Sequence, residues 1–296
     1  MGIKGTTRLI GILGDPVSHS LSPAMHNAAF AHYDLDLAYV PLPVSAADLP
    51  VAVSALRAWN FLGANITLPH KQAIIPYLDE VSDISRLMGA VNTVVNRDGR
   101  LIGTTTDPIG FREGFLESGL TFKGKAVALI GNGGSARTLA FTLALMEDLS
   151  GMALVARDEG KSQILRREIA EKTGKDLTCI PLAEYPARAG DFQIVVNTTP
   201  LGMYPKVDAC PLGEDALMPG QIIYDIIYTP ERTQLLQRAL HKKLNTVGGL
   251  GMLVHQGAAS FKLWTGIDCD IKLLYGTVRK ALRDNLLTRK NPKENS

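Results

Sequence analysis

The sequence predicts an α/β fold in two domains, and three observations along the chain support this prediction. Apolar, strand-like runs alternate with helix-like segments from residue 8 to residue 226. The alternation starts afresh near residue 124, after a break at Asp107-Pro108. The apolar run after this restart leads straight into a glycine-rich turn at 131–137. Regular alternation of this kind is typical of βαβ units around a parallel sheet.

Composition places the chain among globular proteins of the reducing cytoplasm. Its 296 residues are 46% hydrophobic and 20% charged, which is enough to bury the cores of two ordinary domains. No apolar stretch approaches the roughly 18 residues that span a bilayer, and the N-terminus shows no signal-peptide core, so we expect no membrane partner. The cysteines Cys179, Cys210 and Cys269 are odd in number and far apart, which argues against disulfides and a cysteine-built zinc site.

The charge of the chain gives no sign of nucleic-acid binding. The net charge is +2, but residues 279–296 hold six Lys/Arg against two Asp/Glu, a surplus of +4. The remaining chain is therefore at −2, and it shows no basic face. We interpret the basic tail as the solvated end of a helix.

The first domain is expected to alternate strands and helices. A helix should begin at Ser22-Pro23, where a capping hydroxyl precedes a proline at the first helical position. Asp98-Gly99 favours positive φ angles and predicts a tight hairpin turn at 96–99. The predicted strands are 8–13, 37–42, 61–66, 90–95 and 100–105, and the other predicted helices are 48–58 and 69–78.

The second domain is expected to be built around a parallel sheet. Its first strand, 126–130, is a continuous apolar run of the kind that is buried on both faces. The other predicted strands are 152–156, 177–181, 192–196 and 222–226, and the predicted helices are 108–118 and 138–148. Two more helices, 250–265 and 271–287, are predicted at the end of the chain. We place the domain boundary at 107/108. Residues 108–247 form the second domain, and residues 248–296 return to complete the first.

The glycine-rich turn predicts a dinucleotide site of the Rossmann type. A turn that follows a strand and opens a helix lets backbone N–H groups and the helix dipole face a pyrophosphate. Gly131 would allow the tight turn, and Gly133 would allow close backbone approach. The predicted nucleotide-binding residues of this turn are Gly131, Asn132, Gly133, Gly134 and Ser135. The alternative is a tight turn without a ligand.

The end of the next strand bears on the choice of nucleotide. Arg157 and Lys161 would pair with the 2′-phosphate of NADP, whereas Asp158 would accept hydrogen bonds from the ribose of NAD. Arg157 comes first and can also stack on the adenine, which favours NADP. NAD stays an alternative, and Lys161 could equally be a solvated surface residue.

Polar motifs in the first half of the chain carry a resemblance to a known family. They are SLSP at 20–23, NITLPHK at 65–71, GAVNT at 89–93 and TTDPIG at 105–110. Singly, they read as turn residues, a surface lysine (Lys71) or a helix cap (Asp107). In this order and spacing, they resemble the shikimate dehydrogenase family. NTTPLGM at 197–203, YDIIYTP at 224–230 and GGLGMLVHQGA at 248–258 extend the resemblance over nearly the whole chain.

The resemblance implies an oxidoreductase. Its reaction would be the reversible NADPH-dependent reduction of 3-dehydroshikimate to shikimate, in the pathway to chorismate and the aromatic amino acids. Lys71 would act as the acid/base, and Asp107 would orient Lys71 and grip a substrate hydroxyl. Nothing in the sequence suggests a tyrosine–lysine pair or a catalytic zinc.

The resemblance also implies the substrate and cofactor contacts. The hydroxyls of Ser20 and Ser22 suit a carboxylate at the start of a helix. Thr67, Asn92, Asp107 and Gln256 would bind the ring hydroxyls, and Tyr228 would close the pocket from the nucleotide domain. Asp83, Ile226 and Gly249 would lie beside the nicotinamide half of the cofactor. We interpret His19, His26 and His70 as turn or packing residues, and expect no metal.

Departures from the family pattern leave alternatives open. Thr105 stands where members usually have Asn, and Pro108 where they usually have Gly. Members that use NADP usually read Asn-Arg-Thr where this chain has Ala156-Arg157-Asp158. An NAD-dependent quinate/shikimate dehydrogenase is therefore the first alternative, and an inactive nucleotide-sensing regulator is a distant one. The sequence is compatible with a monomer or a homodimer.

Overall fold

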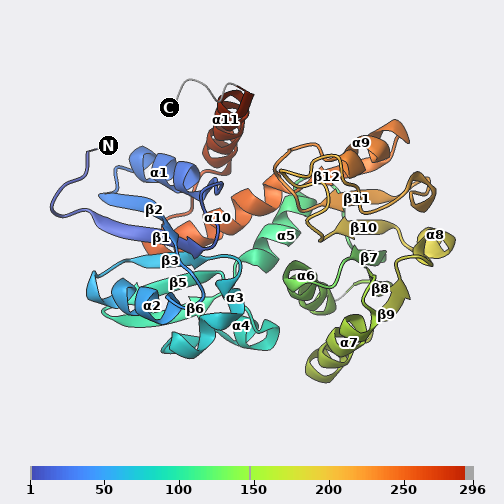
Figure 1. Ribbon diagram of the computed structural model, residues 1–296, viewed down its shortest axis with the longest axis horizontal. Coiled ribbons are helices and arrows are strands. Elements are labelled where there is room, and N and C mark those ends of the chain that lie inside the picture. Colours follow the sequence, from blue (N-terminus) through green and yellow to red (C-terminus); the bar gives the residue numbers. More distant parts are fainter. Residues whose placement is uncertain (1, 147, 291–296) are drawn as a thin grey trace. The chain divides into compact units, whose positions relative to one another are not determined.

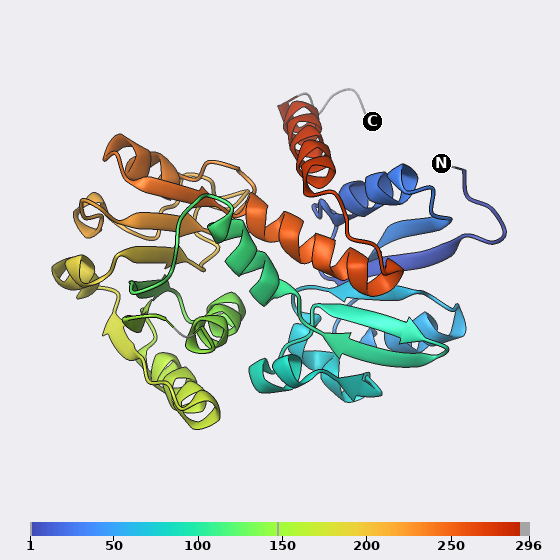
Figure 2. The same cartoon turned by 180° about the vertical axis from the view of Figure 1, so that it is seen from behind.

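The computed structural model describes residues 2–146 and 148–290, which fall into two compact units (Figures 1 and 2). The first unit combines the chain up to Asp107 with the chain from Val254 onward, and the second is Pro108–Leu253. Each unit is built around one six-stranded sheet with helices packed on it, which confirms the predicted α/β fold with two sheets. Among the described residues, no helix is both long and apolar enough to cross a bilayer.

The sheet of the first unit is mixed. Its strand order is β2-β1-β3-β5-β6-β4, with β1 parallel to β2 and β3, and with β5 antiparallel to β3 and β6. The strands are β1 (Arg8–Gly14), β2 (Leu37–Pro43), β3 (Gly63–Ile66), β4 (Glu80–Val81), β5 (Thr93–Arg97) and β6 (Arg100–Thr104). Parallel strands end at the same edge, so the residues after β1 and β3 lie close together.

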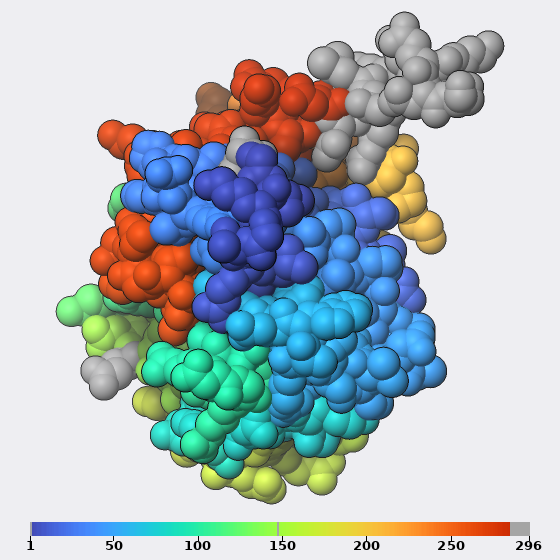
Figure 3. All heavy atoms as spheres, turned by 90° about the vertical axis from the view of Figure 1, so that its left-hand side faces the viewer, coloured from blue at the N-terminus to red at the C-terminus, as the bar shows by residue number. Residues whose placement is uncertain are grey.

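Helices from both ends of the chain cover this sheet. Helix α11 packs against α1, and Figure 3 shows the N-terminal segments (blue) beside the C-terminal helices (red) on one face. The helices are α1 (Ser22–His32), α2 (Leu49–Ala58), α3 (His70–Ala73), the 3-10 turn Ile75–Tyr77, α4 (Asp83–Met88), α10 (Leu250–Thr265) and α11 (Ile271–Lys290). The division into two units falls at the start of α5 (Asp107–Leu116) and within α10.

Most predicted elements of the first unit are present, with three corrections. Ser22 is the first residue of α1 and not its cap, because Leu21 precedes the helix and makes no capping side-chain bond. The helix predicted at 69–78 is wrong. Pro76 has no N–H and would clash with the preceding turn, so α3 ends at Ala73 and a 3-10 turn follows. The strand predicted from residue 90 begins only at Thr93.

The hairpin turn between β5 and β6 matches its prediction. Asp98 and Gly99 both have positive φ angles, 53° and 87°, as the tight turn requires. The short strand β4 was not predicted, since a two-residue strand has no periodicity to detect.

The sheet of the second unit is parallel throughout, with the strand order β12-β11-β10-β7-β8-β9. This is the doubly wound order of dinucleotide-binding folds, and it confirms the predicted Rossmann-type sheet. The strands are β7 (Ala126–Ile130), β8 (Gly151–Ala156), β9 (Thr178–Pro181), β10 (Ile194–Asn197), β11 (Ile222–Asp225) and β12 (Asn245–Gly248). Because the order runs outward in both directions from β7, right-handed crossovers place α6 and α7 on one face and α9 on the other.

The helices of the second unit begin close to the strand ends. They are α5, α6 (Gly134–Ala144), α7 (Glu159–Thr173), α8 (Tyr185–Arg188) and α9 (Gln234–His241), with 3-10 turns at Ala189–Asp191 and Glu214–Ala216. The helix predicted at 138–148 was four residues late at its start, because the turn already closes at Gly133 and α6 begins at Gly134. Strand β12 was missed, since only Val247 of its residues is buried and it shows no apolar run.

Candidate active site

An ion pair in the first unit joins Lys71 and Asp107. Lys71 lies on the short helix α3, directly after β3, and Asp107 opens α5. The Lys71 Nζ donates to Asp107 Oδ2 at 2.6 Å. The lysine side chain is 30% exposed and the aspartate side chain 8%, so the pair joins a buried aspartate to a partly exposed lysine.

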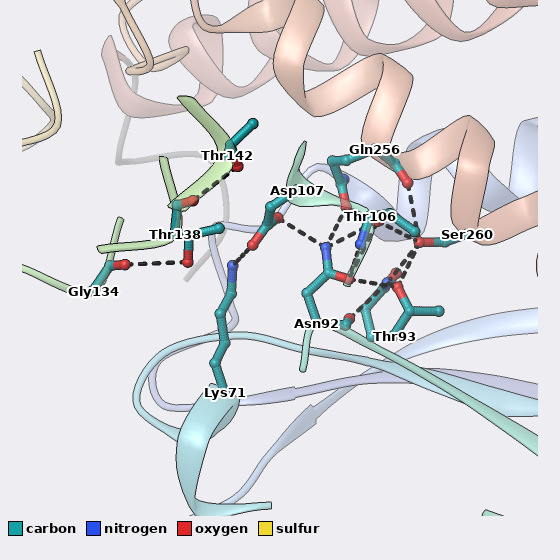
Figure 4. Close-up of polar contacts among 11 residues, drawn as sticks. Lys71, Asn92, Thr93, Thr106, Asp107, Gly134, Thr138, Thr142, Gln256 and Ser260 are labelled. Atoms are coloured by element: carbon teal, nitrogen blue, oxygen red, sulfur yellow. Dashed lines mark hydrogen bonds and ion pairs between the residues drawn. The ribbon is translucent and has the colours of Figure 1, made fainter. Parts of the chain in front are cut away.

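The second oxygen of Asp107 is bound by Asn92, which precedes β5. Asn92 Nδ2 donates to Asp107 Oδ1 at 2.8 Å, and Figure 4 shows Asn92 and Lys71 approaching the carboxylate from different sides. Asp107 thus uses both oxygens on side chains and does not cap its own helix. The structure brings together Lys71, Asn92 and Asp107, which the sequence picked out from separate motifs.

Gln256 joins the same group from the C-terminal part of the chain. It lies on α10, and its Oε1 is 3.3 Å from Asn92 Nδ2. The first unit therefore assembles this group from residues 71 to 256, far apart in the sequence.

Ser20, Ser22 and Thr67 lie at the same strand edge. Ser20 and Ser22 follow β1, and the Ser22 N–H is 3.3 Å from Ser20 Oγ. Thr67 follows β3, and its N–H donates to Leu13 O at 2.9 Å. In the described part of the chain, none of these three side chains bonds to Lys71, Asn92 or Asp107. Their substrate contacts stay a prediction.

The glycine-rich turn of the second unit opens α6. Gly131 has a φ of 114°, which L side chains rarely adopt, and a Cβ there would meet Thr198 Oγ1 at 2.8 Å. At Gly133 and Gly134 a Cβ would meet nothing within 4 Å, so the space at the N-terminus of α6 is open. Ser135 is exposed in the first turn of this 11-residue helix. This is a helix end with free N–H groups that face open space.

Asn132 and Asp158 tie this turn to the start of α7. Asn132 Nδ2 donates to Asp158 O at 2.7 Å and to Ser162 Oγ at 3.0 Å. Asp158 Oδ1 accepts from the Lys161 N–H at 2.9 Å and so caps α7. Arg157 directly precedes this cap and has an exposed side chain, as does Lys161.

The remaining predicted cofactor residues lie in both units. Gly249 packs so closely on Ile226 that a Cβ there would lie 2.1 Å from the Ile226 carbonyl oxygen. Both residues follow strands, β12 and β11, and Tyr228 lies two residues further on, half-buried. Asp83, in the first unit, is exposed and opens α4, whose cap is Ser82. The roles of Asp83, Tyr228, Ile226 and Gly249 stay predictions.

The histidines named in the sequence lie at turn and packing positions. His70 is buried, and its Nε2 is 2.7 Å from Val44 O. His26 stacks on Tyr39 with ring centroids 4.6 Å apart, and burial lowers the pKa of His26 to about 3. His19 is exposed in the loop before α1. Over residues 2–146 and 148–290, no three His, Cys, Asp or Glu side chains are grouped so as to hold a metal.

Sequence reasoning missed two buried polar clusters. One surrounds Asn92 in the first unit and includes Asn65, Thr93, Thr106 and Ser260. The other, in the second unit, joins Asn197, Asp225 and Thr233. A signal was present for Asn65, Asn197 and Asp225, because each is a polar residue inside or at the end of an otherwise apolar strand. Buried polar groups of that kind need partners.

Two family models match the chain. The one for the shikimate dehydrogenase substrate binding domain matches residues 12–94, and the one for the shikimate 5′-dehydrogenase C-terminal domain matches residues 249–283. The first match runs from within β1 to within β5, and it includes Lys71 and Asn92. The second covers Gln256.

Known proteins resemble the chain over nearly its full length. It is 40% identical to the shikimate dehydrogenase (NADP(+)) of Desulforamulus reducens, covering 95% of this chain and 97% of that protein. A crystal structure of a shikimate dehydrogenase in complex with NADP+ matches with a TM-score of 0.90 and 37% identity, covering 95% and 98% of the two chains. The Thermus thermophilus shikimate 5-dehydrogenase in complex with NADP(H) and shikimate matches at 0.82 and 34%, covering 93% and 99%.

Proposed function

Because the chain belongs to the shikimate dehydrogenase family, we propose that it catalyses the reversible reduction of 3-dehydroshikimate to shikimate with NADPH. This places it in the pathway to chorismate and the aromatic amino acids. The observation that carries the proposal is the contact of 2.6 Å between Lys71 Nζ and Asp107 Oδ2, in a chain 40% identical to an enzyme of that name. An amine held by a buried carboxylate, on a lysine side chain that is 30% exposed, is suited to proton transfer.

The second unit has groups that fit NADP. The open N-terminus of α6 suits a pyrophosphate, with Gly131, Asn132, Gly133, Gly134 and Ser135 around it. NADPH supplies the hydride that reduces the ketone carbon. We also propose that Asp83, Ile226 and Gly249 line the nicotinamide half of the cofactor.

The hydrogen bond that caps the start of α7 favours NADP over NAD as the cofactor. Asp158 would favour NAD if its carboxylate bound the ribose. That carboxylate instead accepts the Lys161 N–H and fixes the start of the helix. The exposed Arg157 beside it is suited to pair with a 2′-phosphate, and Lys161 adds a second positive charge. No observation favours the NAD-dependent quinate enzyme over the NADP-dependent one.

Lys71 would move the proton in this reaction. As hydride reaches the ketone carbon, the C=O double bond becomes a C–O single bond, and the Lys71 ammonium gives one proton to the oxygen. The neutral amine regains a proton from water. Asp107 holds the amine in place through its Oδ2.

The other polar side chains of the first unit would hold the substrate. Ser20 and Ser22 would bind the carboxylate, and Thr67, Asn92 and Gln256 would bind ring hydroxyls with Asp107. We propose that residues 1–107 with 248–296 form the substrate domain and residues 108–247 the nucleotide domain, from which Tyr228 contributes. An unpaired buried hydroxyl costs about 1–3 kcal/mol, so such a pocket needs a partner for each.

Initial rates with each cofactor and substrate test the proposal. The absorbance of the reduced nicotinamide should fall when 3-dehydroshikimate is added to the protein with NADPH, and rise with shikimate and NADP+. We expect kcat/KM to be higher with NADP+ than with NAD+, and with shikimate than with quinate. Higher values with NAD+ and quinate would support the alternative. No turnover with any pair would support the nucleotide-sensing regulator.

We also propose a reducing compartment, the cytoplasm, for this protein. Cys179, Cys210 and Cys269 are all free, as expected where thiols stay reduced. Light scattering after size exclusion would decide between the monomer and the homodimer.

A further inference from the structure

Three buried hydroxyl groups meet beside Asn92 in the first unit. They belong to Thr93 on β5, Thr106 before α5 and Ser260 on α10, and all three residues are at most 1% exposed (Figure 4). Ser260 Oγ lies 2.8 Å from Thr93 Oγ1 and 3.2 Å from Thr106 Oγ1. None of these three residues is among the predicted site residues, yet they surround Asn92, which binds Asp107.

The donors and acceptors in this cluster can be assigned in order, beginning with the Tyr39 hydroxyl. Its hydroxyl donates to Asn65 Oδ1 at 2.7 Å, so the amide nitrogen of Asn65 points the other way. That nitrogen donates to Thr93 Oγ1 and to Ser260 Oγ, each at 3.2 Å. The same nitrogen donates to Asn92 O at 3.1 Å, so its two protons are shared among three acceptors. Because this nitrogen can only donate, both hydroxyl oxygens face it as acceptors, and their own protons are left for other partners.

The Thr93 hydroxyl in turn sets the orientation of the Asn92 amide. Its hydroxyl donates to Asn92 Oδ1 at 2.8 Å, and the Thr106 N–H donates to the same oxygen at 2.8 Å. The amide nitrogen of Asn92 is therefore the atom that faces Asp107 Oδ1. If the amide were flipped, its oxygen would lie against a carboxylate, and its nitrogen would face the Thr106 N–H.

We propose that Thr93 and Ser260 are positioning residues of the dehydrogenase reaction. Thr93 fixes the Asn92 amide directly, and Ser260 does so through its contacts with Thr93 and Thr106, so that the amide offers an N–H to Asp107 Oδ1. Asp107 Oδ2 is then held toward Lys71, 2.6 Å away. The inference rests on the proposed function, because it assigns Thr93 and Ser260 to the proton-transfer step. Neither residue touches substrate, since both are fully buried.

Thr93→Val and Thr93→Ser form a matched pair. The first removes the hydroxyl and keeps the shape, whereas the second keeps the hydroxyl and removes a methyl group. We expect Thr93→Val to lower kcat about 10- to 100-fold, since small misplacements of catalytic groups have effects of that size. KM for NADPH should stay within about twofold, and the pH profile of kcat should move. Thr93→Ser should stay close to the parent.

Ser260→Ala is a second test of the inference, and it leaves fewer polar groups without a hydrogen-bond partner. Asn65 keeps Thr93 as an acceptor, so we expect a folded protein with kcat lowered about threefold to tenfold. The melting temperature checks the fold of each variant. If Thr93→Val does not fold, Ser260→Ala decides the question through kcat and the pH profile.

Labelling of Lys71 with acetic anhydride gives a readout that needs no turnover. Lys161, which is exposed in the second unit, serves as the reference in the same digest. An amine released from a partly exposed ion pair should react about two- to fivefold faster, which we expect in Thr93→Val but not in Thr93→Ser. A parent protein that reduces no 3-dehydroshikimate would contradict the proposed function but leave this readout intact.

Two results would overturn the inference. One is parental kcat, pH profile and Lys71 labelling in folded Thr93→Val and Ser260→Ala. The other is a loss in Thr93→Ser as large as in Thr93→Val, because the hydroxyl would then not be the cause.

Discussion

Asp107 and Asp225 are both buried aspartates, one in each unit, but their surroundings differ. Asp107 is 6% exposed and pairs with the Lys71 amine, whereas Asp225 is 0% exposed and has only neutral partners among the described residues. These are the Thr233 hydroxyl at 2.7 Å, and the Ile227 N–H and Asn197 Nδ2 at 3.1 Å. Burial outweighs these bonds and raises the pKa of Asp225 to about 6.

The difference separates a chemical role from a structural one. Asp107 holds the amine of a partly exposed lysine. Asp225 joins the start of α9, through Thr233, to the loop after β10, through Asn197. Asn197 in turn accepts the Thr199 N–H at 2.9 Å. A buried charge without a cation is costly, so Asp225 contributes by accepting hydrogen bonds and not by its charge.

The largest effect should come from removing the amine of the first unit. Lys71→Ala should lower kcat about 10²- to 10⁴-fold, the range for general acid–base catalysis. It should also lower the melting temperature, because the buried Asp107 carboxylate loses its cation. Steady-state kinetics and thermal unfolding measure the two. Asp225→Asn is the control, because it should keep most of the activity. Near-normal turnover in Lys71→Ala with normal substrate binding would refute its role.

The second effect concerns stability. Asp225→Ala leaves the Thr233 hydroxyl, the Ile227 N–H and the Asn197 amide without their acceptor, so we expect a loss of about 3–4 kcal/mol in unfolding free energy. Urea unfolding measures this. Asp107→Ala should lose less, since its partner Lys71 is 30% exposed and can be hydrated. An equal loss at both positions would remove the distinction between the two aspartates.

The third effect is a pH dependence of stability. The pKa of Asp225 is raised from 3.8 to about 6, so folding favours its protonated form. The stabilisation is complete below pH 3.8 and is lost as the pH rises through about 6. Relative to Asp225→Asn, the parent should lose about 2–3 kcal/mol over that window. Parallel unfolding curves of the two proteins would contradict the raised pKa.

The smallest effect concerns the cofactor. Arg157→Ala should raise KM for NADPH about tenfold and leave KM for NADH nearly unchanged, because only the former carries a 2′-phosphate. Arg167→Ala, within α7 and ten residues further along the chain, is the control. If both cofactors were affected alike, Arg157 would act by stacking on the adenine and not through the phosphate.

The sequence predicted the framework well where periodicity was strong. The alternation of strands and helices, the parallel second sheet and the helix at 250–265 all follow from apolar patterns, and the last matches α10 at both ends. The two-residue strand β4 has too few positions to show a pattern, and β12 has one buried residue and no apolar run. Pro76 was overlooked as a helix breaker, which produced the wrong helix at 69–78.

The candidate site was predictable in its parts more than in its connections. Lys71, Asn92 and Asp107 were picked out by motif, and the structure adds their mutual bonds. The contact of Thr93 with Ser260 spans 167 residues of sequence. A single sequence has no local signal for such a contact, since tertiary packing alone decides which hydroxyls meet.

The first unit is built from both ends of the chain, and this affects how it folds during translation. On the ribosome, Asn65, Asn92 and Thr93 emerge well before Ser260 and Gln256, with the whole second unit in between. Until α10 leaves the exit tunnel, Asn65 and Thr93 lack one of their partners. Nascent chains stalled when Leu253 has just left the exit tunnel should therefore protect the second unit from protease while the first remains sensitive.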